Sequence, residues 1–202
     1  MDDRTGRDDA AEIRAWRRAV RQRLLEARTT MPLEEHQAKS AAVVGLLTAE
    51  FPWIRTRRVG IYWPYRREIS LLGLADRILE EGGAVSLPVV VEKGRPVQFR
   101  NWRPGDPLSR DSHGIAFPRE GAAVAPDVLI VALVGFDAGA FRLGYGSGYY
   151  DRTLAAADPR PTTIGVGFEL MRLETIRPQP HDIPMDFIVT EAGVAARRPP
   201  AA

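Results

Sequence analysis

A glycine-rich segment near the middle of the chain has the residue types of an anion-binding loop. Residues 135–151 read GFDAGAFRLGYGSGYYD. They follow an apolar run at residues 128–134, which predicts a buried strand, and residues 149–156 contain few helix breakers and could start a helix. A strand, a glycine loop and a helix in this order can present backbone N–H groups and a helix N-terminus to a phosphate.

The side chains of this segment suit the same chemistry. Gly144, Gly146 and Gly148 lack a Cβ, so the backbone there can adopt positive φ and approach an anion closely. Arg142 adds a permanent positive charge on a planar group of donors that matches phosphate. Asp151 adds a carboxylate oxygen of the kind that Mg²⁺ prefers.

The glycine spacing alone does not decide the function. The segment lacks the Lys-Ser/Thr ending of a Walker A loop, and Gly-x-Gly-x-Gly differs from the dinucleotide-binding spacing Gly-x-Gly-x-x-Gly. On these residues alone, a tight structural turn and a phosphate site remain equally open.

The longer string at residues 142–152, RLGYGSGYYDR, is more specific. It closely resembles the signature of the 5-formyltetrahydrofolate cyclo-ligase family, also called 5,10-methenyltetrahydrofolate synthetases, and the resemblance extends over most of the chain. Ser147 and Ala140 stand where many members of that family have glycine. Ala140 would be strained if its turn requires positive φ.

The resemblance implies an ATP-dependent conversion of 5-formyltetrahydrofolate to 5,10-methenyltetrahydrofolate, with ADP and phosphate released. In that reaction the formyl oxygen attacks the γ-phosphate of ATP, and N10 of the folate then closes the ring and expels phosphate. Such phosphoryl transfer depends mainly on positioning and charge neutralisation. It requires no covalent nucleophile, which suits a chain without cysteine.

The resemblance also implies the residues of the site, with Mg²⁺ as cofactor and ATP as co-substrate. Arg142 and Tyr149 are the implied catalytic residues, and Asp151 shares the magnesium ion with Asp182 of the His181-Asp182 pair. The implied ATP site combines two arginines of an N-terminal helix with the glycine loop: Arg17, Arg21, Arg142, Leu143, Gly144, Tyr145, Gly146, Ser147, Gly148, Tyr149 and Tyr150. The implied folate site comprises Trp63, Glu68, Tyr145, Gly146, Ser147, Gly148 and Tyr149.

The N-terminal helix is predicted at residues 11–30, where apolar residues recur at spacings of three and four. Between Ile13 and Thr30 there are six arginines and one glutamate, with several arginines on a face away from the apolar stripe. Such a face fits either a solvated surface or an anion site. The resemblance favours ATP phosphates, with Arg17 at a position where the family often has lysine.

The remaining elements predict one α/β domain over residues 11–190, with a disordered tail at 1–10 and a flexible tail at 191–202. Further helices are expected at 33–50 and about 71–81, the second with Ser70 as its N-cap. Residues 103–125 are expected to form an irregular connection. Strands are expected at residues 59–63, 84–89, 97–102, 162–168 and 187–190, with the strand at 97–102 as an edge strand. The β-α-β spacing predicts a mostly parallel sheet between helices, and the resemblance implies the three-layer fold of NagB/RpiA and CoA-transferase proteins.

Trp63 ends a predicted strand and Glu68 follows it, at the carboxyl end where open α/β sheets place ligands. The alternative for Glu68 is a structural one, in which it begins a helix near the positive end of the helix dipole.

The composition favours a cytoplasmic, monomeric enzyme acting on small molecules, without a membrane or nucleic-acid partner. The chain has 202 residues, 45% of them hydrophobic and 27% charged, and a net charge of +2. The N-terminus is charged and lacks the apolar core of a signal peptide. Two alternatives remain open: a sugar-phosphate isomerase on the same fold, which needs no ATP, and a nucleic-acid-binding protein acting through the basic helix. The low net charge argues against the second.

Overall fold

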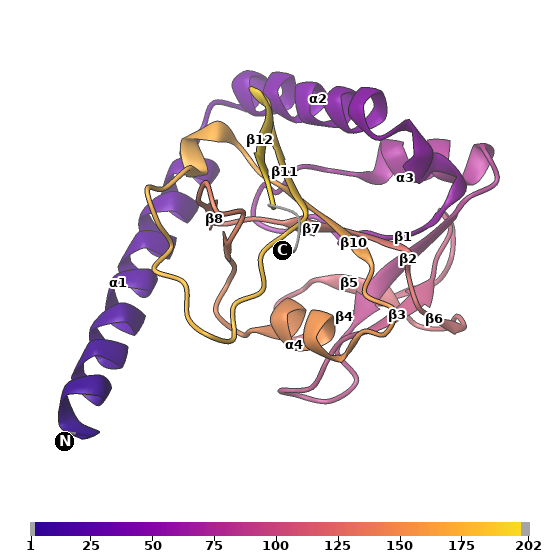
Figure 1. Ribbon diagram of the computed structural model, residues 1–202. Coiled ribbons are helices and arrows are strands. Elements are labelled where there is room, and N and C mark those ends of the chain that lie inside the picture. The colour runs from indigo at the N-terminus through magenta and orange to yellow at the C-terminus, as the bar shows by residue number, and fades with distance from the viewer. Residues whose placement is uncertain (1–2, 199–202) are drawn as a thin grey trace.

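One sheet of eight strands runs through the centre of the computed structural model, which describes residues 3–198 (Figure 1). The strand order is β12-β11-β10-β7-β1-β2-β3-β6. In chain order the strands are β1 (Arg58–Gly60), β2 (Ala84–Val89), β3 (Gln98–Asn101), β6 (Ala123–Val124), β7 (Val128–Ala132), β10 (Thr162–Val166), β11 (Phe187–Thr190) and β12 (Gly193–Arg197). The five strands from β11 to β2 are parallel, and β12, β3 and β6 are antiparallel to their neighbours. The predicted α/β class with a mostly parallel sheet is confirmed.

Helices cover both faces of the sheet and complete three layers. Figure 1 shows α2 and α3 above the sheet, α4 below it, and α1 along one side. The helices are α1 (Asp3–Thr30), α2 (Leu33–Glu50), α3 (Leu72–Glu80) and α4 (Tyr149–Ala156), with short 3₁₀ helices η1 (Pro52–Thr56) and η2 (Glu169–Met171). No helix among the described residues is long and apolar enough to cross a membrane.

Strand β7 lies at the centre because its sequence is apolar on both faces. Val128 to Val131 are all buried, as expected for a parallel strand covered by helices on both sides. The chain then turns through a hairpin of β8 (Gly135–Phe136) and β9 (Arg142–Leu143) and enters α4. The central strand therefore delivers the glycine loop, residues 144–148, to the carboxyl end of the sheet.

A second, smaller core holds α1 against this hairpin. Val20 and Leu24 of α1 pack with Val134, Leu143 and Ile176. The approach is close, since a Cβ at Gly135 would lie 2.9 Å from Cδ1 of Leu24. This contact fixes the register of the basic helix beside the glycine loop.

Several predicted elements differ from the structure. The N-cap of α3 is Leu71, without a side-chain hydrogen bond, and not Ser70. Residues 103–125 contain β6 and a hairpin of β4 (Leu108–Arg110) and β5 (Ala116–Pro118), and β6 pairs outside β3, so β3 is not the edge strand. These strands of two or three residues are too short to give a period-two pattern.

The described parts of the two expected tails also carry regular structure. Helix α1 begins at Asp3, inside the tail expected at residues 1–10. Strand β12 pairs antiparallel with β11 inside the tail expected at 191–202. Its sequence, GVAAR, has little β-propensity, so pairing with β11 decides its conformation. Residues 1–2 and 199–202 lie outside the described residues.

Candidate active site

The glycine loop has the backbone geometry expected of an anion site at two of its three glycines. Gly146 has φ +100° and Gly148 has φ +64°, whereas Gly144 is not in the positive-φ region. Gly148 is the N-cap of α4 and provides no side-chain cap, so the first N–H groups of the helix lack that partner. Ala140, upstream of the loop, has φ +61°, which confirms the strained turn considered from the sequence.

Two arginines hold the loop by its carbonyl oxygens. Arg21 of α1 donates from Nε to the Gly144 carbonyl at 2.7 Å, and Arg152 of α4 donates from Nη2 to the Ser147 carbonyl at 2.6 Å. In a trans peptide the next N–H points opposite to that carbonyl. The N–H groups of residues 145 and 148 therefore point away from the two arginines, and within the described part of the chain no acceptor binds the N–H groups of residues 145–148.

The glycines make room for these arginines. A Cβ at Gly146 would lie 3.3 Å from Cζ of Arg21, and a Cβ at Gly148 would lie 2.9 Å from Nη1 of Arg152. Burial lowers the pKa of Arg21, and repulsion from Arg17 and Arg18 acts in the same direction. An anion at the loop would relieve this repulsion.

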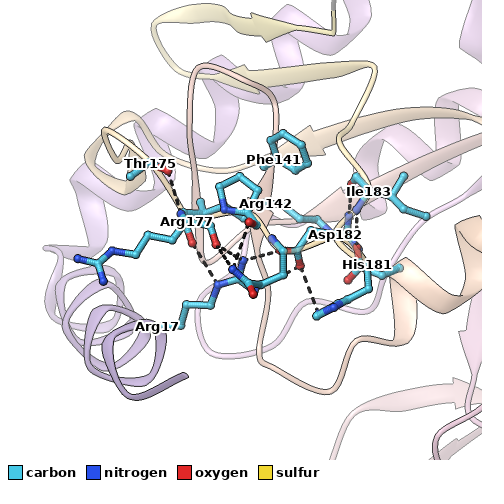
Figure 2. A network of polar contacts seen from close by, with 12 residues as sticks. Arg17, Phe141, Arg142, Thr175, Arg177, His181, Asp182 and Ile183 are labelled. Atoms are coloured by element: carbon cyan, nitrogen blue, oxygen red, sulfur yellow. Dashed lines mark hydrogen bonds and ion pairs between the residues drawn. The ribbon is translucent and has the colours of Figure 1, made fainter. Parts of the chain in front are cut away.

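Two arginine–aspartate pairs lie next to the loop (Figure 2). Arg142, buried at the end of the β8–β9 hairpin, pairs with Asp151 of α4, with 3.0 Å between Nη2 and Oδ1. Arg17 of α1 pairs with Asp182 through both of its Nη atoms and also donates from Nε to the Ile176 carbonyl. Figure 2 shows Arg17, Arg142 and Asp182 converging from α1, the hairpin and the segment that also carries His181 and Ile183.

Asp151 of α4 contacts the segment that carries Asp182, the other predicted metal ligand. Oδ1 of Asp151 accepts the N–H of Ile183 at 3.1 Å, one residue after Asp182. Burial opposes ionisation of Asp182, but hydrogen bonds from Arg17 and the Gln179 N–H outweigh it and lower its pKa. The carboxylate is thus kept in the deprotonated form that a metal ligand requires, while both of its oxygens accept from Arg17.

These residues fit magnesium that arrives with a nucleotide. Mg²⁺ usually keeps several waters and binds one or two carboxylates together with phosphate oxygens. Over residues 9–198, whose side chains are described, no group of three or more His, Asp or Glu side chains could hold a metal ion. Two carboxylates beside a glycine loop whose N–H groups are unpaired among the described residues match that mode of binding.

Glu68, predicted to contact folate, lies at the other end of the glycine loop and does not begin a helix, since α3 starts at Leu72. Its Oε1 accepts the Tyr145 hydroxyl at 2.8 Å and its Oε2 accepts the Tyr65 N–H at 2.9 Å. Burial raises the pKa of Glu68, opposed by the charge of Arg28 and by both hydrogen bonds. Tyr145 therefore connects the glycine loop to Glu68.

The other predicted site residues lie around these groups. Leu143 is buried against α1, so only its backbone can face a ligand. Tyr149 lies under the guanidinium of Arg152, with 5.2 Å from Cζ to the ring centre, and Tyr150 lies 5.9 Å from Cζ of Arg142. Trp63 packs edge-on against Trp102, with ring centres 5.9 Å apart. Ser147 is exposed at the tip of the loop.

Sequence reasoning missed three residues that shape the site: Arg28, Arg152 and Asp137. Arg28 is almost fully buried, although it was grouped with the basic face of α1. Arg152 ends the signature string, and the resemblance implies no role for it. Asp137 is buried and accepts the N–H groups of Gly139, Phe141 and Ile176, which holds the hairpin before Arg142 against the segment that receives Arg17. Its position in the GFDAG turn was the available signal.

Comparisons with known proteins show the family to which this chain is similar. The model of the 5-formyltetrahydrofolate cyclo-ligase family matches residues 13–191. The 5-formyltetrahydrofolate cyclo-ligase of Mycolicibacterium smegmatis is 31% identical over 189 residues, covering 89% of this chain and 96% of that protein. The enzyme of the same name from Escherichia coli K12 is 28% identical over 182 residues, covering 87% of this chain and 98% of that protein.

Solved structures show the same likeness. The 5,10-methenyltetrahydrofolate synthetase of Aquifex aeolicus has a TM-score of 0.78 at 29% identity, covering 92% of this chain and 94% of that chain. The synthetase of Mycoplasma pneumoniae, at 20% identity and a TM-score of 0.72, shares the fold. The family match spans nearly the whole described chain, including the glycine loop and both arginine–aspartate pairs, and this chain belongs to the 5-formyltetrahydrofolate cyclo-ligase family.

Proposed function

We propose that this chain converts 5-formyltetrahydrofolate to 5,10-methenyltetrahydrofolate with ATP as co-substrate, releasing ADP and phosphate. Membership of the cyclo-ligase family supports the reaction. The observation that carries the site assignment is the glycine loop itself. Its partner-free N–H groups lie between two arginine–aspartate pairs on one side and the Tyr145–Glu68 hydrogen bond on the other.

The chemistry requires activation of a poor nucleophile and a poor leaving group, the formyl oxygen. Transfer of the γ-phosphoryl group to that oxygen needs alignment and neutralisation of charge. Arg142, Arg17 and the loop N–H groups would provide both without a covalent intermediate on the protein. Magnesium held by Asp151 and Asp182 would add positive charge at the phosphate chain of ATP.

Glu68, Tyr145 and Trp63 would bind the folate at the opposite end of the loop. Glu68 offers carboxylate oxygens to N–H groups of the pterin, and Trp63 offers a flat apolar surface. ATP would then lie at the end of the loop near the two arginine–aspartate pairs, the phosphate end, and folate at the end near Glu68, the folate end. The formyl oxygen and the γ-phosphate would meet above the loop. N10 would then attack the formyl carbon, which carries the phosphorylated oxygen, and the bond between that carbon and oxygen would break to close the ring and expel phosphate.

The test is the absorbance of the methenyl-folate product after ATP, Mg²⁺ and 5-formyltetrahydrofolate are added to the purified protein. We expect product and ADP in equal amounts, and no product when ATP or Mg²⁺ is omitted. Failure to form methenyl-folate with both present would contradict the proposal. Isomerisation of a sugar phosphate without ATP would point to the other enzyme class on this fold.

We also propose, on the sequence grounds given above, a cytoplasmic monomer that acts on small molecules without a nucleic-acid partner. Light scattering of the purified protein measures its oligomeric state. Binding of duplex DNA or RNA that weakens steeply with salt would contradict the last part of the proposal.

A further inference from the structure

Arg28, near the C-terminal end of α1, is one of the largest fully buried side chains, with 1% of its surface exposed. Each of its three nitrogens is used. Nε donates to the Arg66 carbonyl at 3.0 Å, Nη1 to the Leu133 carbonyl at 3.1 Å, and Nη2 to the Tyr145 hydroxyl at 2.6 Å. One guanidinium thus joins the loop before α3, the end of β7 and the glycine loop.

A buried guanidinium needs a counter-charge, because an unpaired buried charge is strongly unfavourable. The partner is Glu68, with 3.9 Å between Nη2 and Oε1. The contact runs mainly through Tyr145, whose hydroxyl accepts from Arg28 and donates to Oε1 of Glu68 at 2.8 Å. Arg28, Tyr145 and Glu68 therefore form a buried chain from α1 to the folate end of the site.

The turn that carries Glu68 is strained and held from outside. Arg66 and Arg67 both lie in the left-handed region, with φ +46° and +58°. Such backbone persists only where surrounding contacts fix it, and it is concentrated at functional sites. Arg28 holds the Arg66 carbonyl, and Nε2 of His36 on α2 donates to the Arg67 carbonyl at 2.8 Å.

We propose that Arg28 is a positioning residue for folate binding, which acts through the Tyr145 hydroxyl and the Arg66 carbonyl to hold the Glu68 carboxylate in place. The proposal rests on the function proposed above and adds a residue outside the implied ATP and folate sites. It divides α1 between the two substrates. Arg17 and Arg21 serve the phosphate end, whereas Arg28 serves the folate end.

The surroundings of Glu68 give the proposal a pH signature. The charged and titratable groups around it are Arg28 of α1, Tyr62 after β1, Tyr145 of the glycine loop and Tyr150 of α4. Burial raises the pKa of Glu68 and the charge of Arg28 opposes that rise. Without Arg28 the pKa of Glu68 would rise further, so protonation would persist to higher pH and the acid limb of kcat/KM for folate would move to higher pH.

The main test compares Arg28→Gln, Glu68→Gln and the double variant in steady-state kinetics. Arg28→Gln should raise the KM for 5-formyltetrahydrofolate about tenfold or more, the scale of one hydrogen bond to a charged group. The KM for ATP should stay near that of the wild type, and the acid limb should shift as described. In the Glu68→Gln background the same change should add little, because a neutral side chain needs no cation.

A second variant keeps the test decisive if Arg28→Gln fails to fold. Tyr145→Phe removes only the connecting hydroxyl from a ring that is 42% exposed. We expect a rise of about fivefold in the folate KM, as for one neutral hydrogen bond. The proposal would be overturned if folded Tyr145→Phe kept the wild-type folate KM. It would also be overturned if the effects of Arg28→Gln and Glu68→Gln on the folate KM multiplied fully in the double variant. A wild-type protein that forms no methenyl-folate would instead contradict the proposed function.

Discussion

Two carboxylates of the candidate site each face an arginine of α1, yet their pKa values move in opposite directions. Asp182 pairs with Arg17 and its pKa is lowered, whereas Glu68 pairs with Arg28 and its pKa is raised. The side chains of Asp182 and Glu68 have similar exposed surface, 9% and 6%, but Glu68 lies deeper within the protein. Burial disfavours the charged form in both.

Besides this difference in depth, the two acids differ in how directly each arginine reaches its partner. Arg17 donates to both oxygens of Asp182, and the Gln179 N–H adds a third hydrogen bond. Arg28 stays 3.9 Å from Glu68 and reaches it through the Tyr145 hydroxyl. For Asp182 the direct contacts outweigh the cost of burial, whereas for Glu68 the relayed contact does not outweigh a larger cost. Asp182 therefore stays ionised to lower pH, and Glu68 gains a proton more readily.

The largest effect should come from Asp151→Asn, which tests whether the phosphate end can be disabled separately. We expect turnover to fall by about 1000-fold, the upper range for losing one group that neutralises charge in a preorganised site. The folate KM should change little, because Asp151 lies on α4 beside Arg142 and not beside Glu68. Steady-state kinetics at saturating Mg²⁺ measures both parameters.

The matched control for this change is Asp127→Asn. Asp127 also pairs with an arginine, Arg58, but at the amino-terminal edge of β7 and with more solvent around it. Its replacement should leave turnover unchanged. If Asp151→Asn kept wild-type turnover, its assignment as a metal ligand would be wrong; if the folate KM rose as much as turnover fell, the two ends would not be separable.

Gly146→Ala should have the next largest effect and tests whether the loop acts through its backbone. A Cβ there meets both a φ of +100° and the guanidinium of Arg21 at 3.3 Å. We expect kcat to fall by about 100-fold, as when one oriented N–H donor is lost. Most of the variant protein should remain folded, since strain at one residue costs about 1–2 kcal/mol.

Gly94→Ala is the control for backbone strain alone. Gly94 has φ +81°, and nothing lies within 4 Å of an added Cβ. It should lower the melting temperature to a similar degree and leave the specific activity intact. Equal specific activities in the two variants would identify the glycine loop as a structural turn.

Arg21→Ala should give a smaller change, confined to ATP. Arg21 holds the Gly144 carbonyl and lies against Gly146, so its loss frees the phosphate-binding loop. We expect the KM for ATP to rise about tenfold, the scale of one charge-assisted hydrogen bond. Arg23 lies two residues further along α1 and is exposed. Arg23→Ala is therefore the control and should leave the KM for ATP unchanged. A rise in the folate KM instead would place Arg21 at the folate end.

The sequence predicts the helices and strands correctly wherever the local residue pattern favours the same conformation that packing in the fold requires. The apolar run of β7, the crossover from β1 through α3 to β2, and α2 all appear close to their predicted bounds. Strands β4, β5, β6 and β12 were missed because each depends on its partner strand for its conformation. A strand of two or three residues carries too few side chains for a periodic signal.

Within the site, the signature string located the loop, but burial could not be inferred. Arg28 and Arg18 are both arginines of the same basic helix, and the sequence does not distinguish them, yet Arg28 is buried and Arg18 is exposed. The left-handed turn at Arg66 and Arg67 has no glycine to mark it. Ala140 was detectable only because the family usually has glycine there. Positions decided by tertiary contacts carry no local signal.

The smallest expected effect concerns stability and tests the opposite pKa shifts directly. Because the pKa of Asp182 is lower in the folded state, its ionisation stabilises the fold above the unfolded pKa of about 4, and this contribution is lost as pH falls further. Because the pKa of Glu68 is higher in the folded state, its contribution is present at low pH and is lost as pH rises through the folded value.

The two replacements should therefore show opposite trends when urea unfolding is measured from neutral pH down to about pH 4 and slightly below. The stability lost in Asp182→Asn should shrink as the pH falls, because the wild type loses its own ionised carboxylate there. For Glu68→Gln, the stability of the wild type relative to the variant should instead grow as the pH falls. Each change should be about 1 kcal/mol, since both acids retain other hydrogen bonds. Trends of the same sign would mean that direct and relayed arginine contacts hold these two acids alike, and the contrast between the two ends of the site would be lost.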